Sequence, residues 1–87
     1  MALSFPNSSR SYDPSRRSVS FWGHDAWTEI TFDVGEDALK HIDPHPHPDE
    51  TTSLHAFDAN RPQIEHAAGN AYAKRRQTYF RLQASDF

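Results

Sequence analysis

Two stretches of the chain, Ser18–Trp22 (SVSFW) and Thr28–Val34 (TEITFDV), decide the fold because apolar and polar side chains alternate along both. A period of two residues is that of a β-strand, and the intervening Gly23–Ala26 is short enough for a hairpin loop. The pattern therefore predicts two antiparallel strands with one buried face. The buried face would carry Val19, Phe21, Ile30, Phe32 and Val34, and the outer face Ser18, Ser20, Trp22, Trp27, Glu29, Thr31 and Asp33.

Shorter segments are expected to extend this sheet. Leu3–Phe5 alternates and stops at a proline, which predicts a short edge strand. Gln77–Leu82 alternates again and predicts a last strand, with Tyr79 and Arg81 on its outer face. The segment Asn7–Arg17 is rich in serine, asparagine, aspartate and proline, and is expected to be a loop.

Helical patterns precede the last strand. Glu36–Ile42 opens with two acids, which suit a helix start, and must stop before Pro44 because a residue before proline disfavours the α region. From about Thr52 onward, one stripe of side chains recurs at steps of three and four residues, as on one face of a helix. The stripe consists of Leu54, Phe57, Arg61, Ile64, Ala68 and Ala71.

Pro62 interrupts this second helical pattern, because a proline ring removes one backbone hydrogen bond from a helix interior. The stripe keeps its phase across Pro62, which favours one kinked helix. The alternative is a break at Asp58–Arg61, with Pro62 in the first turn of a new helix and Asn60 as its cap.

These elements predict an α+β fold in a single domain, residues 1–87. The expected architecture has two layers, an antiparallel sheet of about four strands and two helices on one face. The expected order along the chain is β-β-β-α-α-β.

The order of landmarks along nearly the whole chain resembles a known family. The landmarks are Leu3-Ser4-Phe5-Pro6, Tyr12-Asp13, Val19–His24, Ile30–Val34, Ala38-Leu39, Ala56-Phe57-Asp58, Arg61, Ile64, Tyr72, Leu82 and Asp86-Phe87. The chain is similar to short bacterial proteins known as the domain of unknown function number fourteen-eighty-eight. The resemblance implies a two-layer α+β fold with three antiparallel strands, two helices and a last strand returning to the sheet. It implies no activity and no catalytic residue.

The amino-acid composition excludes several classes of function and of cellular location. The absence of cysteine excludes disulfides, thiolate metal sites and cysteine nucleophiles. No apolar run reaches the ~18 residues of a membrane span, and residues 1–6 are too short and polar for a signal peptide. We therefore expect a cytoplasmic protein.

No constellation of residues predicts an enzyme. The serines lack a Gly-x-Ser-x-Gly elbow, and the three glycines form no phosphate-binding loop. Adjacent acids stand where helix starts favour negative charge. We predict no catalytic residue and no cofactor.

Three binding hypotheses remain. The leading one is a non-enzymatic interaction domain that binds a protein partner, or a second copy of itself, through aromatic side chains on the outer sheet face. The residues expected to contact the partner are Trp22, Trp27, Tyr79 and Arg81.

The first alternative is a regulator that binds nucleic acid through basic side chains. Its candidate residues are Arg16, Arg17, Lys74, Arg75 and Arg76. The net charge of −3 argues against it, although residues 61–87 carry +3 while residues 35–60 carry −5.

The second alternative is weak transition-metal binding by His41, His45 and His47 of the histidine–proline tract. The spacing matches no zinc finger, and in an extended polyproline-like stretch alternate side chains point apart. A solvated linker is the favoured interpretation of this tract.

Overall fold

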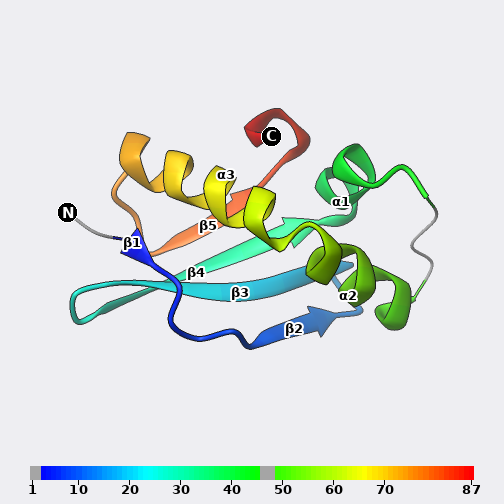
Figure 1. Cartoon of the computed structure of the whole chain (residues 1–87), viewed down its shortest axis with the longest axis horizontal. Coiled ribbons are helices and arrows are strands. Elements are labelled where there is room, and N and C mark those ends of the chain that lie inside the picture. The colour runs from blue at the N-terminus through cyan, green and yellow to red at the C-terminus, as the bar shows by residue number, and fades with distance from the viewer. Residues whose placement is uncertain (1–2, 46–48) are drawn as a thin grey trace.

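The computed structural model describes residues 3–45 and 49–87, and in them a mixed sheet is covered on one face by helices (Figure 1). β3 lies inside the sheet, with β4 antiparallel on one side and both β1 and β2 antiparallel on the other. β5 pairs in parallel with β4 and forms the opposite edge. The strands are β1 (Leu3–Ser4), β2 (Arg10–Asp13), β3 (Ser18–Asp25), β4 (Thr28–Gly35) and β5 (Tyr79–Leu82).

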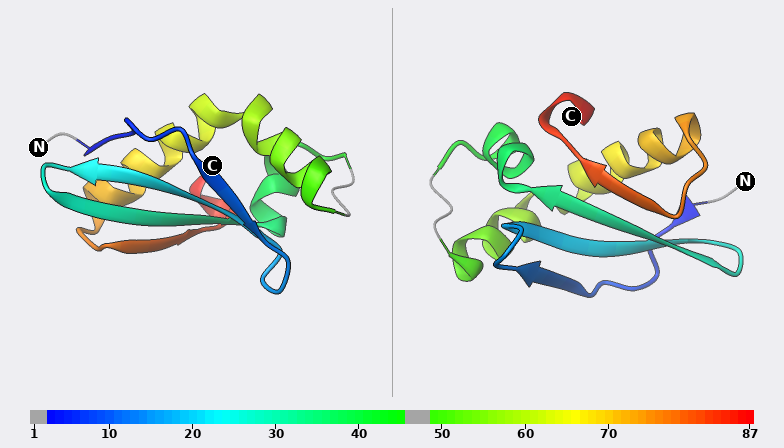
Figure 2. Two further views of the ribbon diagram at one scale, coloured as in Figure 1. Left: turned by 90° about the horizontal axis from the view of Figure 1, so that it is seen from below. Right: turned by 180° about the vertical axis from the view of Figure 1, so that it is seen from behind.

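Three α-helices connect β4 to β5 in the described part of the chain, and all of them lie on the same side of the sheet (Figures 1 and 2). α2 packs over β2 and β3, and α3 packs over β5. The helices are α1 (Glu36–Ile42), α2 (Glu50–Ala59) and α3 (Arg61–Lys74), and a 3-10 turn, η1 (Ala84–Asp86), follows β5. None of these helices is long and apolar enough to cross a lipid bilayer.

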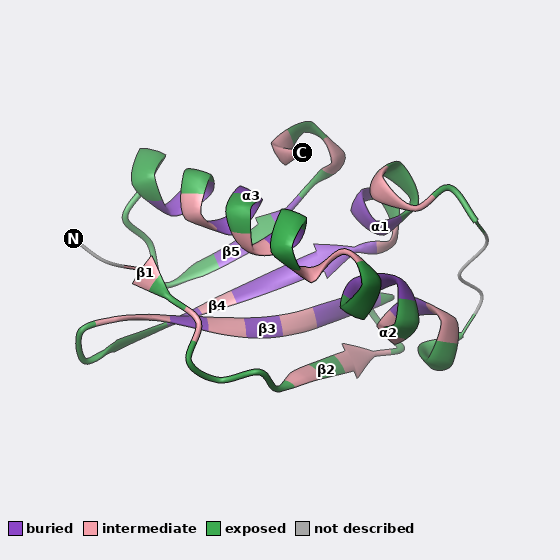
Figure 3. Ribbon diagram, viewed as in Figure 1, coloured by how far each residue is buried: buried purple, intermediate pink, exposed green. Residues whose placement is uncertain are grey.

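The core fills the space between the sheet and the helices, as the buried segments in Figure 3 show. The alternation predicted for the strands is confirmed, because every predicted inward side chain is buried. The buried apolar residues are Val19, Phe21, Ile30, Phe32, Val34, Phe80 and Leu82 from the sheet, and Ala38, Leu39, Ala56, Phe57, Ile64, Ala67, Ala68, Ala71 and Tyr72 from the helices.

The α+β class is confirmed, but four details of the predicted architecture are wrong. Within the described residues the sheet has five strands instead of about four. It is not purely antiparallel, because β5 returns to β4 after a helical connection, which is the usual route to a parallel pair. The described helices number three instead of two. Arg10–Asp13, predicted as part of a loop, forms β2, because its backbone pairs with the outer edge of β3.

The prediction of one kinked helix through Pro62 is also wrong. α2 ends at Ala59 and α3 begins at Arg61, so Pro62 stands in the first turn of α3, where its missing N–H costs no hydrogen bond. Asn60 separates the helices, but its side chain does not cap α3. Instead its amide nitrogen donates back to the carbonyl of Ala56 in α2 (2.9 Å).

The β3–β4 hairpin closes later than the sequence pattern predicted. Asp25 pairs with Thr28, so the loop consists of Ala26 and Trp27 instead of Gly23–Ala26. Ala26 adopts a positive φ of 56°, which lets the two-residue turn follow the twist of the strands. Trp27 is therefore a loop residue and not part of the outer face of β4.

Candidate interaction surface on the outer face of the sheet

The outer face of the sheet carries a row of three side chains at the same level of three strands. Trp22 of β3 pairs with Thr31 of β4, and Thr31 pairs in turn with Tyr79 of β5. Trp22 and Thr31 are half-buried, and Tyr79 is 43% exposed. We call Trp22, Thr31 and Tyr79 the aromatic row.

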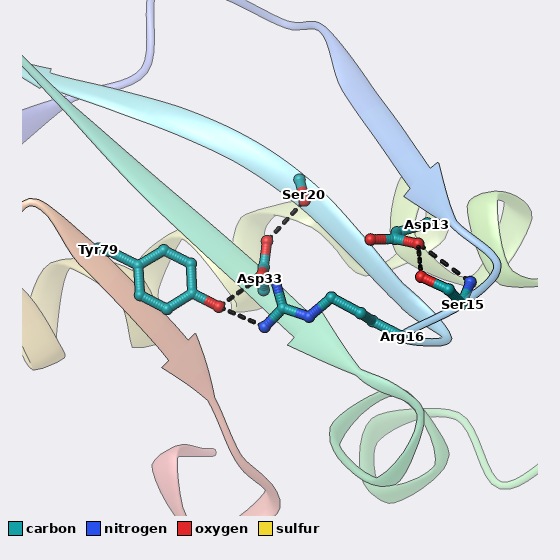
Figure 4. A network of polar contacts seen from close by, with 6 residues as sticks. All are labelled: Asp13, Ser15, Arg16, Ser20, Asp33 and Tyr79. Carbon is teal, nitrogen blue, oxygen red and sulfur yellow. Dashed lines mark hydrogen bonds and ion pairs between the residues drawn. The ribbon is translucent and has the colours of Figure 1, made fainter.

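Asp33, two residues beyond Thr31 on the same face of β4, is the centre of a polar network (Figure 4). Its carboxylate is only 3% exposed. It accepts hydrogen bonds from the hydroxyls of Ser20 (2.5 Å) and Tyr79 (2.6 Å). Arg16 completes the network with an ion pair of 2.9 Å from Nη1 to Oδ2 of Asp33. Asp33 and Ser18, predicted on a solvated face, are both buried.

Arg16 reaches this position from the turn between β2 and β3. Asp13 holds the turn by accepting hydrogen bonds from the backbone and hydroxyl of Ser15 (3.0 and 2.7 Å), which lower the pKa of the Asp13 carboxyl. The Arg16 guanidinium then lies over the Tyr79 ring, 5.8 Å from its centroid, and donates to its hydroxyl (2.6 Å). That hydrogen bond, followed by the charge of Asp33, raises the pKa of Arg16. The turn thus fixes a cation on the aromatic row.

The four residues predicted for partner binding are only partly brought together. Trp22 and Tyr79 share the aromatic row, and Arg81 lies on the same face beside Asp33. Trp27 lies apart from them in the hairpin loop and is 100% exposed.

The residues predicted for nucleic-acid binding fall into two separate groups. Arg16 and Arg17 immediately precede β3, near its first residue. Arg75 and Arg76 follow α3, where Arg76 lies over Tyr72, whose hydroxyl donates to Asp25 at the far end of β3 (2.6 Å). Lys74 ends α3 and is exposed. The candidate basic residues therefore stand at opposite ends of the sheet.

The histidine tract is described only in part. His41 is exposed on α1, and His45 Nδ1 lies 2.7 Å from the Asp43 carboxylate, while His47 lies outside the described residues. Within residues 3–45 and 49–87, no group of three side chains could hold a metal ion.

Sequence reasoning missed the network because its members are distant along the chain. Tyr79 and Asp33 are 46 residues apart. One feature of the sequence could have indicated the network. Asp33 stands among residues that favour a strand, where an acid is disfavoured unless it has hydrogen-bonding or charged partners.

Comparisons with known proteins agree with this fold. The model of a family described as "protein of unknown function (DUF1488)" matches residues 3–82. A crystal structure of a protein of unknown function from the same family of Shewanella loihica PV-4 superposes with a TM-score of 0.83. The two chains are 17% identical, and the match covers 93% of this chain and 91% of that chain. No curated protein shows significant similarity.

Proposed function

This chain belongs to the DUF1488 family, and we propose that it is a non-enzymatic interaction domain whose outer sheet face docks against a second copy of itself. The single observation that supports this most is the distribution of the helices. In the described part of the chain all helices cover one face of the sheet (Figure 2), and the pairing of the strands places the aromatic row on the opposite face. A cytoplasmic location stays part of the proposal, because a chain without cysteine suits a reducing compartment.

The size and chemistry of the face suit a protein interface. The molecule measures 36 × 23 Å along its two longest axes, and a standard interface covers about 800 Å² per partner. Tryptophan, tyrosine and arginine are the residues enriched at interface centres, and Trp22, Tyr79 and Arg16 all lie on this face.

The charges on either side of the aromatic row favour a second copy as the occupant. Along β4, Asp33 with its covering Arg16 lies two residues to one side of Thr31, and Glu29 lies two residues to the other side. A two-fold axis running along the row would place Arg16 opposite Glu29 of the partner subunit, and the reverse. Both side chains keep about half of their surface exposed, 47% for Arg16 and 55% for Glu29.

Sedimentation velocity over a range of protein concentrations tests the proposal. We expect a reversible dimer in the wild type. Thr31→Glu places a carboxylate at the centre of the row and should give a monomer that remains folded, because Thr31 contributes no side chain to the buried core. The matched control is Thr28→Glu, the same change at an exposed position of β4, which should dimerise like the wild type.

A second variant tests the charge arrangement. Glu29→Lys would oppose Arg16 of the partner subunit and should weaken the dimer, and the weakening should diminish at high salt. A wild type that stays monomeric at millimolar concentration, or a Thr31→Glu variant that dimerises normally, would overturn the proposal.

The positions of the basic side chains support nucleic-acid binding less well than self-association. The basic groups lie at opposite ends of the sheet, and Arg75 and Arg76 are stacked on Phe80 and Tyr72. Binding of a polyanion is favoured by a continuous basic stripe.

A further inference from the structure

A hollow of about 720 Å³ opens beside the outer face, where three segments distant in the sequence converge. These are the turn before β3, the junction of β4 with α1, and the segment that leaves β5. The charged side chains that line it are Arg16, Arg17, Glu36, Asp37 and Arg81. Its volume lies within the range of small-ligand sites.

Arg81, an exposed residue of β5, lies beside Gly35 in the lining of this hollow. The backbone of Gly35 is extended (φ −74°, ψ 168°), a conformation that any residue adopts, so the glycine is not required by the backbone. A Cβ at this position would lie 2.7 Å from Nη2 of Arg81. The missing side chain therefore provides the space that the Arg81 guanidinium occupies.

The three arginines differ in whether a carboxylate already neutralises them. Arg16 is held by buried Asp33, and Arg17 lies 3.6 Å from Glu36. For Arg81, no ion pair or hydrogen bond is found within residues 3–45 and 49–87. Of the three arginines, Arg81 is thus the one whose five N–H donors have no recorded partner among the described residues.

We propose that the hollow binds the carboxylate group of a ligand through Arg81, with Arg17 as the second cation. A guanidinium forms two parallel hydrogen bonds with a carboxylate. The lining side chains carry three positive and two negative charges, a net charge of +1 that one carboxylate neutralises. A phosphate monoester would bring nearly two negative charges against Glu36 and Asp37. The inference does not depend on the proposed dimer.

Titration of the ¹⁵N-labelled protein with sodium benzoate, followed by NMR, tests this site. We expect saturable shifts at Gly35, Arg81 and Ser85, and none with benzamide, the uncharged analogue of similar shape. A short peptide with a free or an amidated C-terminus forms the second pair of probes. Shifts with the free peptide alone would identify a chain terminus as the source of the carboxylate, and shifts with benzoate alone would identify a small molecule.

Two variants and a control test the assignment to Arg81. Arg81→Gln should weaken benzoate binding at least about tenfold, a difference of 1.4 kcal/mol. Gly35→Ala should also weaken it, because the added methyl group displaces the guanidinium. Lys74→Ala removes the same charge at an exposed position at the end of α3 and should bind like the wild type. Equal binding by Arg81→Gln, no saturable shift with either carboxylate, or tighter binding of inorganic phosphate would overturn the proposal.

Discussion

The two faces of the sheet are built from the same strands but are stabilised by different kinds of interaction. On the helix side, Phe21 stacks on Phe32 and Phe32 on Phe80, with ring centroids 5.2 and 5.3 Å apart. On the outer side, the buried carboxylate of Asp33 accepts hydrogen bonds from two hydroxyl groups and forms an ion pair with Arg16. Apolar burial contributes in proportion to area, whereas a buried charge is stable only while its partners are present. The difference predicts which substitutions each face tolerates.

The largest effect is expected on the helix side. Phe57 is fully buried, its ring centroid lies 5.3 Å from that of Phe21, and the Arg61 guanidinium lies over the ring, 5.1 Å from its centroid. Phe57→Ala should lower the free energy of unfolding by about 3–5 kcal/mol, because it leaves a cavity in the core. Urea denaturation measures the loss. The control Trp27→Ala removes a fully exposed ring and should stay within about 0.5 kcal/mol of the wild type. A small loss for Phe57→Ala would show that α2 is wrongly placed on the sheet.

On the outer side, Asp33→Asn should cost about 1.5–3 kcal/mol, the range for hydrogen bonds to a charged group. The amide keeps the shape of the side chain but removes the charge that binds Arg16. Asp37→Asn, at an exposed position in the first turn of α1, is the matched control and should cost only about 0.3–1 kcal/mol, the contribution of an acid at a helix start. Equal stability of the Asp33 and Asp37 variants would mean that the outer network contributes nothing to the fold.

A smaller effect is expected where α2 meets α3. Pro62 lies in the first turn of α3, so Pro62→Ala should destabilise the protein by about 0.4–1 kcal/mol, because the unfolded chain gains freedom. Thermal unfolding of this variant and of Gln63→Ala, its exposed neighbour, measures the difference. A gain in stability would instead indicate that the two helices form one strained helix.

The smallest effect concerns the pair that ties β2 to the helix layer. The hydrogen bond from Arg10 holds the pKa of the Asp58 carboxyl below its usual value. This stabilisation is complete above the unfolded pKa, about 3.9, and is lost as the pH falls through the lower folded pKa. Both side chains are partly exposed, so the pair contributes only about 0.2–1 kcal/mol.

Urea denaturation between pH 3 and pH 7 compares Arg10→Gln with the wild type. The variant should lose part of the acid dependence, and Arg17→Gln, which removes a longer and more exposed pair, should lose less. Identical pH dependence in the wild type and in Arg10→Gln would contradict this account of Asp58.

The core positions on the helix side could be predicted from the sequence because their signals are periodic and local, whereas the break between α2 and α3 was not predicted. The alternation around Phe21 and Phe32 and the helical stripe through Phe57 and Ile64 both identify core positions correctly. The alternation of apolar and polar residues along β5 does not show whether the strand runs parallel or antiparallel to its neighbour. Its parallel direction follows from the long helical connection after β4, which is typical of a parallel pair.

The outer side could not be predicted in the same way. A strand pattern assigns Asp33 to a face but does not show that Arg16 and Tyr79, far away in the sequence, cover it. Arg81 is a similar case, because only the fold shows that its guanidinium lies against Gly35. β2 was missed because it lies in a segment rich in serine, asparagine, aspartate and proline, which is typical of a loop, and because it pairs only with β3 at the edge of the sheet.

The helix-covered face of the sheet contains the apolar core, and we propose that the outer face, besides its buried Asp33 network, binds a second copy of the chain. The most direct measurement is a dilution series of ¹⁵N–¹H NMR spectra from millimolar to micromolar protein. The account predicts concentration-dependent shifts at Trp22, Thr31 and Tyr79 and across the outer face, with α2 and α3 unchanged. Spectra that do not change on dilution, or shifts confined to the helices, would contradict it.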